Sequence, residues 1–346
     1  MANQRPNLNI QGLDPDTAAA CALFEEYPLD RQAIGADSGT EVQLILAGGF
    51  NHFSQMLALA AAQTAHYANG RPPRLVLFDH PDEAEGELRG RFPQAEAAAR
   101  FVFTGLKLAS PAGQERLARD VQKEDRLTTL VFRDEQPPQG LPAWLPPWSG
   151  RENILILALA GDVDNHPMRE FMKPGEAGFN IRLFRADALD RQALKIDETA
   201  RILHGYYNAR YPGEPNAGPW EKLEPEARRN NYWQALHLSA KLRAVGCRFT
   251  PRTEAIAGEE PVTWFNDLEI ETLARMEHNR WQANRSLAGY RPGPRDDRRL
   301  FHPDLRPYED LEEDVKDKDR LFIRALPDLA ERLGRIIVRR EKHESG

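Results

Sequence analysis

The chain has 346 residues, about twice the usual size of a single domain, so two domains are expected. Its 41% hydrophobic and 29% charged residues are typical of a globular protein with buried cores and exclude a disordered chain. The net charge of -7 excludes nucleic-acid duplexes as the main partner, because binding their phosphates needs a basic face. Two cysteines, Cys21 and Cys247, are too few for a disulfide framework or a zinc site, which indicates a reducing compartment.

Apolar segments are short throughout the chain. The longest runs, residues 42–47 and 154–160, fall far short of the roughly 20 residues that a membrane-spanning helix needs. The first residues carry no apolar targeting segment. A cytoplasmic location without a membrane span is therefore expected, and any action on a membrane would require a partner.

The N-terminal half alternates short apolar runs with helix-like segments. Helices are expected at residues 16–27, 54–67 and 111–121. Strands are expected at residues 42–46, 74–78, 100–104, 128–132, 153–159 and 181–184. Apolar strands separated by helices indicate a parallel sheet that is covered on both faces. The expected fold class of residues 1–190 is therefore α/β, with a Rossmann-like doubly wound parallel sheet.

Two features help to place the end of this first domain. Residues 135–150 carry five prolines and two tryptophans, and this stretch is interpreted as a surface excursion before the fifth strand. The boundary is expected near residues 187–193, because helix-like periodicity replaces the strand pattern beyond it. Residues 191–346 are then a second, mainly α-helical domain.

The turn after the first strand has part of a dinucleotide-binding fingerprint. Gly48 and Gly49 would let the backbone approach a pyrophosphate, although the third glycine of the motif is missing. Asp79 follows the second strand, where an acid can hold a ribose hydroxyl. Asn51 and His52 complete the candidate site, with capping of the turn as the alternative role for both.

This arrangement resembles the TrkA-N domain of bacterial potassium-transport regulators over roughly residues 41–185. The resemblance implies binding of NAD or an adenine nucleotide, and it implies a homodimer. Phe50 and Phe53 would crowd a pyrophosphate, so a scaffold that has lost or altered its ligand is the alternative.

The second half contains an internal repeat. His204 and Tyr207 match His278 and Trp281 as His-x-x-aromatic, 74 residues apart, in helix-like runs at residues 196–207 and 268–286. Residues 219–223 match residues 307–311, offset by 88, and helix-like runs follow at residues 224–245 and 312–325. The second copy therefore holds 14 extra residues, which fall within the arginine-rich segment 289–302.

The second copy carries a longer motif in residues 273–281 (LARMEHNRW), 289–297 (GYRPGPRDD) and 302–308 (HPDLRPY). It resembles the RyR domain, which occurs as tandem repeats in ryanodine receptors and alone in many bacterial proteins. The first copy is more degenerate. The resemblance covers about residues 195–330, with repeats at about 195–250 and 265–330. It implies a ligand sensor, associated with adenine nucleotides in the receptor family, and a role in nucleotide-signalled defence or channel regulation.

A pseudo-twofold relation between the copies would place Tyr207 and Trp281 on one cleft, where two aromatic faces can stack on a purine. Arginines can bind phosphates in bidentate fashion. The expected ligand-binding residues are His204, Tyr207, His278, Arg280, Trp281, Arg285, Tyr290, Arg291, Arg295, His302 and Tyr308. The alternatives are that Trp281 is a core aromatic, that His278 is a structural histidine and that the arginine-rich segment pairs with its own aspartates.

Three hypotheses about function follow. The leading one is a soluble sensor that binds a nucleotide-like small molecule, more plausible than an enzyme because no nucleophile, base and orienting group are evident together. An enzyme acting on NAD or a signalling nucleotide would use Asp79, His52, the RyR histidines, or Asp162 beside Asp164 after the fifth strand. The third hypothesis is a regulatory subunit of a membrane channel formed by another polypeptide.

Overall fold

A computed structural model describes residues 14–121, 123–132, 153–159, 180–184, 189–213, 217–256 and 258–340. The expected surface excursion at residues 135–150, together with Asp162 and Asp164, lies outside the described residues, as does part of the expected boundary at 187–193. In the part of the chain that is described, no helix combines the length and the apolar character needed to cross a membrane.

The N-terminal half is built on a six-stranded sheet in which every neighbouring pair of strands is parallel. Its strands are β1 (Glu41–Ala47), β2 (Arg74–Leu77), β3 (Arg100–Phe103), β4 (Arg126–Phe132), β5 (Ile154–Leu159) and β6 (Ile181–Phe184). The order β3-β2-β1-β4-β5-β6 is that of a doubly wound Rossmann-like fold, with its switch point between β1 and β4. The expected α/β fold class and its six strands are thereby confirmed.

Alternation along β1 explains how the sheet obtains two buried faces. Leu44 and Leu46 belong to a large core that also contains residues of α1 and α2. Ile45 and Ala47 point to a second, smaller core that contains residues of α5. The helices of this half are α1 (Pro15–Glu26), α2 (His52–Thr64), α3 (Ala84–Arg91), α4 (Ala95–Ala98) and α5 (Pro111–Val121). Because successive side chains of a strand point to opposite faces, a continuous apolar run can fill both cores.

The C-terminal half is mainly helical, with α7 (Leu189–Arg210), α8 (Pro225–Ala244), α9 (Asp267–Leu287), α10 (Glu313–Arg324) and α11 (Leu326–Arg332). Short 3₁₀ turns, η4 (Trp220–Lys222) and η6 (Tyr308–Asp310), precede α8 and α10, and η5 (Arg252–Glu254) follows β7. The start of α9 is fixed by a capping box, in which Asn266 and Glu269 each accept a backbone N–H of the other.

This half also contains strands that the helix-like periodicity of the sequence did not predict. Strands β7 (Cys247–Pro251), β11 (Arg335–Arg340) and β8 (Glu259–Pro261) form an antiparallel sheet in the order β7-β11-β8. Strands β9 (Arg291–Pro292) and β10 (Phe301–His302) pair within the arginine-rich segment. Strand β11 pairs with β7 and β8, which lie about 80–90 residues earlier, and β9 and β10 have only two residues each, so local periodicity could not identify these strands.

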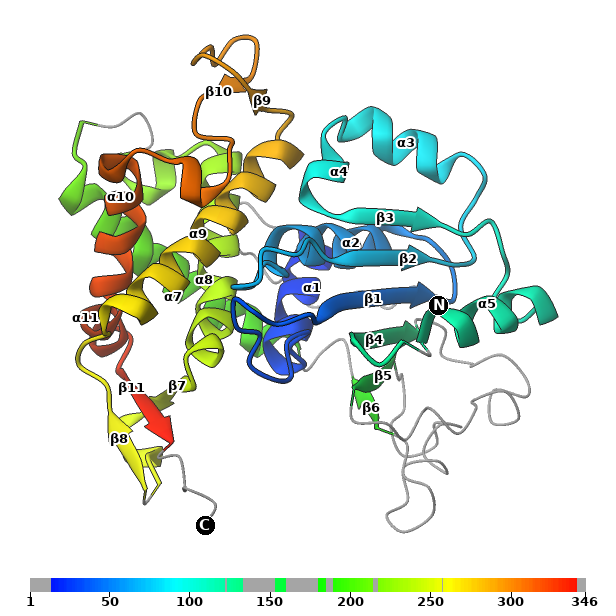
Figure 1. The fold of residues 1–346 in the computed structure, drawn as a ribbon, viewed down its shortest axis with the longest axis horizontal. Coiled ribbons are helices and arrows are strands. Elements are labelled where there is room, and N and C mark those ends of the chain that lie inside the picture. Colours follow the sequence, from blue (N-terminus) through cyan, green and yellow to red (C-terminus); the bar gives the residue numbers. More distant parts are fainter. Residues whose placement is uncertain are drawn as a thin grey trace.

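The two halves share one continuous core, because the large core cluster includes residues from α1 and α2 and also from α7, α8 and α9. His237 of α8 donates a hydrogen bond to the carbonyl of His66 at 2.8 Å, just beyond the end of α2. Arg243 makes two hydrogen bonds to Asp30, at 2.9 and 2.7 Å. Figure 1 shows that β1, β2 and β3 point their carboxyl ends away from α7–α10. The switch-point edge of the sheet therefore does not face the helical half.

Candidate functional site

The turn after β1 has the backbone geometry that its glycines predict. Gly48 and Gly49 have φ angles of 88° and 93°, which only glycine adopts without strain. Asn51 caps α2, because its side chain accepts the N–H of Ser54 at 3.1 Å. His52 contacts Asp16 at the start of α1, with 2.8 Å between Nδ1 and Oδ2. Asn51 and His52 thus perform the capping and turn-fixing roles that were the alternative to nucleotide binding.

The carboxylate of Asp79 is already used by the protein. One oxygen accepts the N–H of Gly48 at 3.1 Å, and the other accepts the N–H of Leu108 at 3.0 Å. Asp79 thus joins the loops that follow β1, β2 and β3, and its own φ of 54° fits this tight junction. A ribose hydroxyl at this position would have to use the remaining acceptor capacity of the carboxylate.

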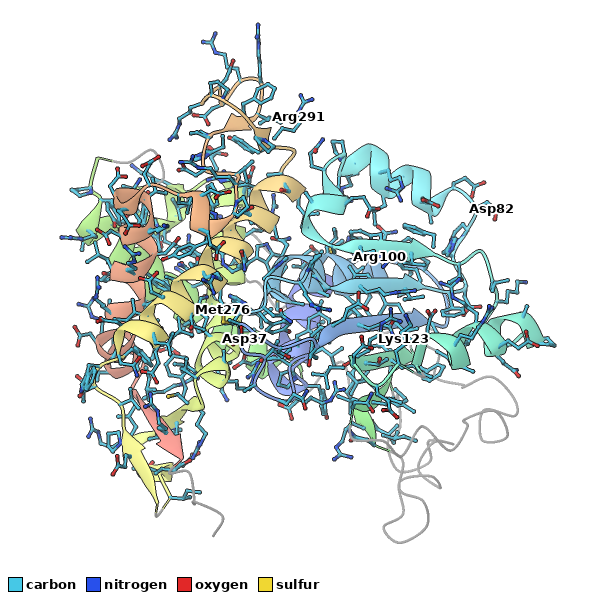
Figure 2. The ribbon with its side chains drawn as sticks, in the orientation of Figure 1. Asp37, Asp82, Arg100, Lys123, Met276 and Arg291 are labelled. Atoms are coloured by element: carbon cyan, nitrogen blue, oxygen red, sulfur yellow. The ribbon has the colours of Figure 1, made fainter. Side chains whose placement is uncertain are left out.

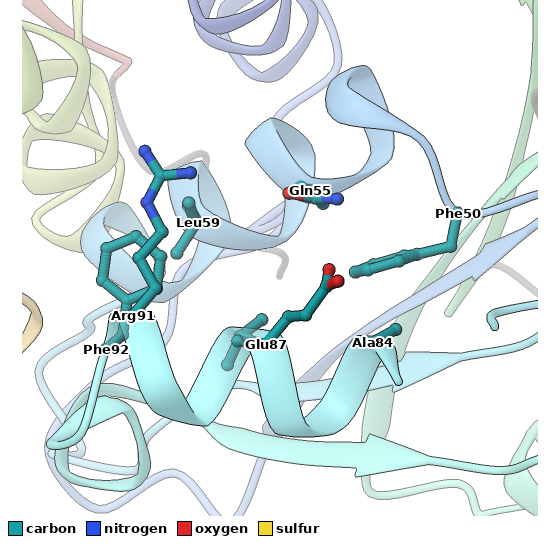
Figure 3. Close-up of a pocket in the computed structure, with 8 residues that line it drawn as sticks. Phe50, Gln55, Leu59, Ala84, Glu87, Arg91 and Phe92 are labelled. Atoms are coloured by element: carbon teal, nitrogen blue, oxygen red, sulfur yellow. The ribbon is translucent and has the colours of Figure 1, made fainter. Parts of the chain in front are cut away.

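Aromatic rings cover the neighbouring sheet edge. Phe50 packs edge-on against Phe103, with 6.3 Å between the ring centroids, and His80 packs against Phe103 at 5.1 Å. Between α2 and α3 lies a cavity of about 90 Å³, where Phe50 and Glu87 reach toward each other (Figure 3). Pockets for small-molecule ligands usually have about 300–1,000 Å³. This cavity is therefore smaller than a dinucleotide requires.

In the C-terminal half, the two copies of the repeat make equivalent contacts. His204 donates its Nε2–H to the carbonyl of Gly218 at 2.7 Å, and His278 donates to the carbonyl of Arg306 at 2.9 Å. The next turn of each helix reinforces this contact, since the Asn208 amide also bonds Gly218. Gln282 similarly bonds the carbonyl of Arg306 at 2.7 Å. Both histidines therefore hold the chain that enters the following 3₁₀ turn, as structural histidines would.

A second set of equivalent contacts involves the 3₁₀ turns themselves. Arg201 lies over the ring of Trp220 at 5.0 Å, and Arg275 lies over the ring of Tyr308 at 6.0 Å. Tyr308 is buried, and its hydroxyl donates to Glu271 at 3.0 Å. Burial, followed by the charge of Glu271, raises the pKa of this hydroxyl. Tyr308 therefore packs inside the second copy and does not face a ligand.

The second copy adds a group of side chains that we call the aromatic–arginine cluster, made of His278, Trp281, Arg285, Tyr290 and His302. Trp281 stacks on His278 with 5.6 Å between ring centroids and packs edge-on against His302 at 4.9 Å. Arg285 lies over both Trp281, at 5.9 Å, and Tyr290, at 5.2 Å. The extra segment of this copy supplies Tyr290 and His302, so the cluster depends on the 14 inserted residues.

The surroundings of the cluster fix its protonation state. Burial lowers the pKa of His278 and of His302, so both rings are neutral at pH 7. The N–H of Asp304 donates to Nδ1 of His302 at 3.2 Å, which leaves the proton of the neutral ring on Nε2. Trp281 and Tyr290 are partly exposed. The cluster thus presents two aromatic side chains and a guanidinium at the surface, backed by neutral histidines.

The other expected ligand-binding residues are placed differently. Tyr207 packs against Tyr211, which follows the last residue of α7, with 5.3 Å between ring centroids. Arg280 is buried, and its guanidinium is bound by the carboxylate of Glu277, with 2.6 Å between Nη2 and Oε1. The expected phosphate contact of Arg280 is therefore not open to a surface ligand.

The exposed arginines of the inserted segment contact either an aromatic ring or a carboxylate of the same segment. Arg291 lies over the ring of Phe301 at 5.0 Å, and Figure 2 places it in the projecting part of the chain that carries β9 and β10. Arg295 pairs with Asp297 at 3.4 Å, the self-pairing that was the alternative for this segment. The labelled Asp82, which follows β2, lies well apart from Arg291, beyond the carboxyl ends of the strands (Figure 2). The cluster and the sheet edge are therefore two separate candidate sites.

Sequence reasoning missed a buried charged network between the halves. Glu277 accepts hydrogen bonds from Arg280 and pairs with the buried Lys241, with 2.7 Å between Nζ and Oε2. Lys241 Nζ also lies 2.9 Å from Nδ1 of His237. Although burial opposes its ionisation, the charges of Arg280 and Lys241 lower the pKa of Glu277 to about 2. The adjacent Glu277 and His278 indicated in the sequence that a charged group stands here, but its partner Lys241 lies 36 residues earlier, on another helix.

Neither cysteine is suited to nucleophilic catalysis. Cys21 and Cys247 are buried, and burial raises the pKa of both thiols. A thiol with a raised pKa is not ionised at neutral pH and does not act as a nucleophile. This weakens the enzyme hypothesis for the described residues.

Comparison of the chain with known protein families gave no match to any family model. A search of curated proteins gave no match either.

Proposed function

We propose that this protein is a ligand-binding sensor whose site is the aromatic–arginine cluster and whose ligand is a nucleotide-like small molecule. The observation that carries the proposal is the junction of Trp281, Tyr290 and Arg285 at the surface of the second copy. A planar base can stack on such rings, at about 1–3 kcal/mol per base, and a guanidinium can bind an anionic group.

The difference between the two copies supports a binding role for this cluster. Both copies share the histidine–carbonyl contacts that hold the chain, so these contacts belong to the structural scaffold that is common to the two repeats. The inserted segment is absent from the first copy, and it adds Tyr290 and His302 around Trp281. An insertion that places aromatic and basic side chains at a surface is typical of a functional loop on a structural scaffold.

The resemblance of residues 273–308 to the RyR domain supports the same reading, since it implies a sensor. We also propose that the protein is cytoplasmic and that it forms a homodimer through its TrkA-N-like half. Binding of NAD or an adenine nucleotide at the sheet edge receives less support, because Asp79 already accepts two backbone N–H groups.

A thermal-shift screen tests the proposal, with NAD, NADP, ATP, ADP-ribose and cyclic mono- and dinucleotides as probes. A ligand at 100 times its Kd adds about 2.7 kcal/mol of stability. The screen is run on the wild type and on Trp281→Ala and Tyr290→Ala, and Tyr207→Ala is the matched control at the equivalent position of the first copy. We expect a shift that is lost in the first two variants and kept in the control. A shift that survives both cluster substitutions, or no shift with any probe, would contradict the proposed function.

A further inference from the structure

The orientation of Arg285 is fixed by its aromatic neighbours. Its guanidinium lies over the rings of Trp281 and Tyr290 at 5.9 and 5.2 Å. The side chain is 23% exposed, so it reaches the surface with most of its length covered. A guanidinium held in this way loses little conformational freedom when it binds an anion.

The hydrogen bonding of Arg285 is incomplete. Its Nε is buried and has no hydrogen-bond partner among the described residues. Its nearest carboxylate is Glu226 of α8, whose Oε1 lies 3.9 Å from Nη1, beyond hydrogen-bond range. By contrast, the neighbouring Arg280 donates both Nε and Nη2 to Glu277, with 2.6 Å between Nη2 and Oε1. Arg285 therefore has the capacity to donate further hydrogen bonds at the surface, whereas all three nitrogens of the buried Arg280 bond Glu277 or Asn230.

Charged side chains of both signs lie around the guanidinium of Arg285. Burial lowers the pKa of His302, and the positive charges of Arg295 and Arg285 lower it further, against the charge of Asp304. Asp297 pairs with Arg295 at 3.4 Å and accepts the hydroxyl of Tyr290 at 3.5 Å. Glu226 is 53% exposed, and its ion pair among the described residues is the long contact with Arg285. An exposed carboxylate in a long contact contributes little stability, so it is easily exchanged for a stronger anion.

We propose that Arg285 is the anion-binding residue of the cluster and that a phosphate group of the ligand displaces Glu226 from it. The site then selects nucleoside phosphates over nucleosides, and Glu226 is a positioning residue that competes with the ligand and limits its affinity. This inference rests on the proposed function, because it assigns the anionic part of the same ligand.

The test measures Kd by calorimetry for AMP and adenosine, and for GMP and guanosine, at fixed salt. For the wild type, we expect the nucleotide to bind roughly 10- to 100-fold more tightly than its nucleoside, as for a hydrogen-bonded charged group. Arg285→Met should remove this preference, so that the nucleotide and its nucleoside bind the variant with the same affinity within about two-fold. Arg285→Lys keeps the charge but not the bidentate geometry, so it should keep only part of the preference.

Glu226→Gln should tighten nucleotide binding by about two- to five-fold, the range of an exposed ion pair, and should leave nucleoside binding unchanged. This gain should vanish in the Arg285→Met background, which a merely structural role of Glu226 would not predict. Arg252→Met and Glu331→Gln make the same charge changes at a remote, exposed ion pair and should alter neither affinity.

The outcomes separate the two proposals. Nucleotides and nucleosides that bind equally well, with binding lost in Trp281→Ala, would overturn the role of Arg285 and leave the sensor site standing. A phosphate preference that persists in Arg285→Met, or a Glu226→Gln variant that binds as the wild type does, would also overturn the inference. Absence of binding by nucleotides and nucleosides alike would contradict both proposals.

Discussion

Replacing Glu277 by glutamine should destabilise the protein strongly. Glu277 is the carboxylate that Arg280 and Lys241 share, and all three side chains are buried. Removing one partner of a buried ion pair costs about 3–5 kcal/mol, because the remaining charges stay out of water. An unfolding entropy of about 2.1 cal/mol/K per residue means that 1 kcal/mol shifts the Tm of a 346-residue chain by roughly 1.4 °C. The Tm should therefore fall by about 4–7 °C.

Scanning calorimetry at neutral pH measures this shift directly, with the chain unfolding as one unit because its two halves share a core. Glu331→Gln makes the same substitution at a side chain that is 68% exposed, and it should change the Tm by less than about 1 °C. A Tm loss of under about 1.5 °C for Glu277→Gln would show that the network does not hold the buried charges as described.

Three further predictions concern stability. The pKa of Glu277, lowered from 4.5 to about 2, gives roughly 3 kcal/mol of stability that is present above pH 4.5 and lost as the pH falls through 2. Urea titrations should therefore show that the difference in unfolding free energy between wild type and Glu277→Gln closes over that range. A difference that stays constant with pH would contradict the lowered pKa of Glu277. Asp79→Asn keeps one acceptor for two backbone N–H groups, so urea unfolding should show a loss of about 1–3 kcal/mol, and an unchanged midpoint would exclude the bridging role. Gly113→Ala places a Cβ 2.1 Å from the carbonyl oxygen of Lys107 and should lower the unfolding free energy by at least about 1–3 kcal/mol. Gly90→Ala in α3 meets nothing within 4 Å and should raise the unfolding free energy by about 0.5–1 kcal/mol. Thermal unfolding that ranks the two variants in the opposite order would refute the packing at both sites.

The sheet could be predicted because its signal is local. Each strand is a short apolar run, and α2 and α5 correspond to the helices expected at residues 54–67 and 111–121, whereas α3 and α4 were not predicted. The small sheet β7-β11-β8 could not be predicted in this way, since β11 pairs with strands about 80 and 90 residues earlier.

Part of the candidate site could also be predicted, because its signal is local in the sequence. Trp281, Tyr290 and His302 stand in a recognisable motif, and the structure brings them together. The sequence could not show which arginines are open to a ligand. Arg280 and Arg285 both lie on α9. The carboxylate of Glu277 binds the guanidinium of Arg280, whereas the carboxylate that the described residues bring to Arg285 is that of Glu226 on α8, in a long contact. Such long-range pairing depends on how α8 and α9 pack.

Hydrogen–deuterium exchange with and without the nucleotide that gives the largest thermal shift tests the location of the site most directly. Because the cluster and the sheet edge are built from separate segments of the chain, peptides from each report separately. We expect slower exchange in residues 289–302 and in the last turn of α9, with no change in residues 48–54. Slower exchange confined to residues 48–54 would contradict the account and assign the ligand to the Rossmann-like sheet.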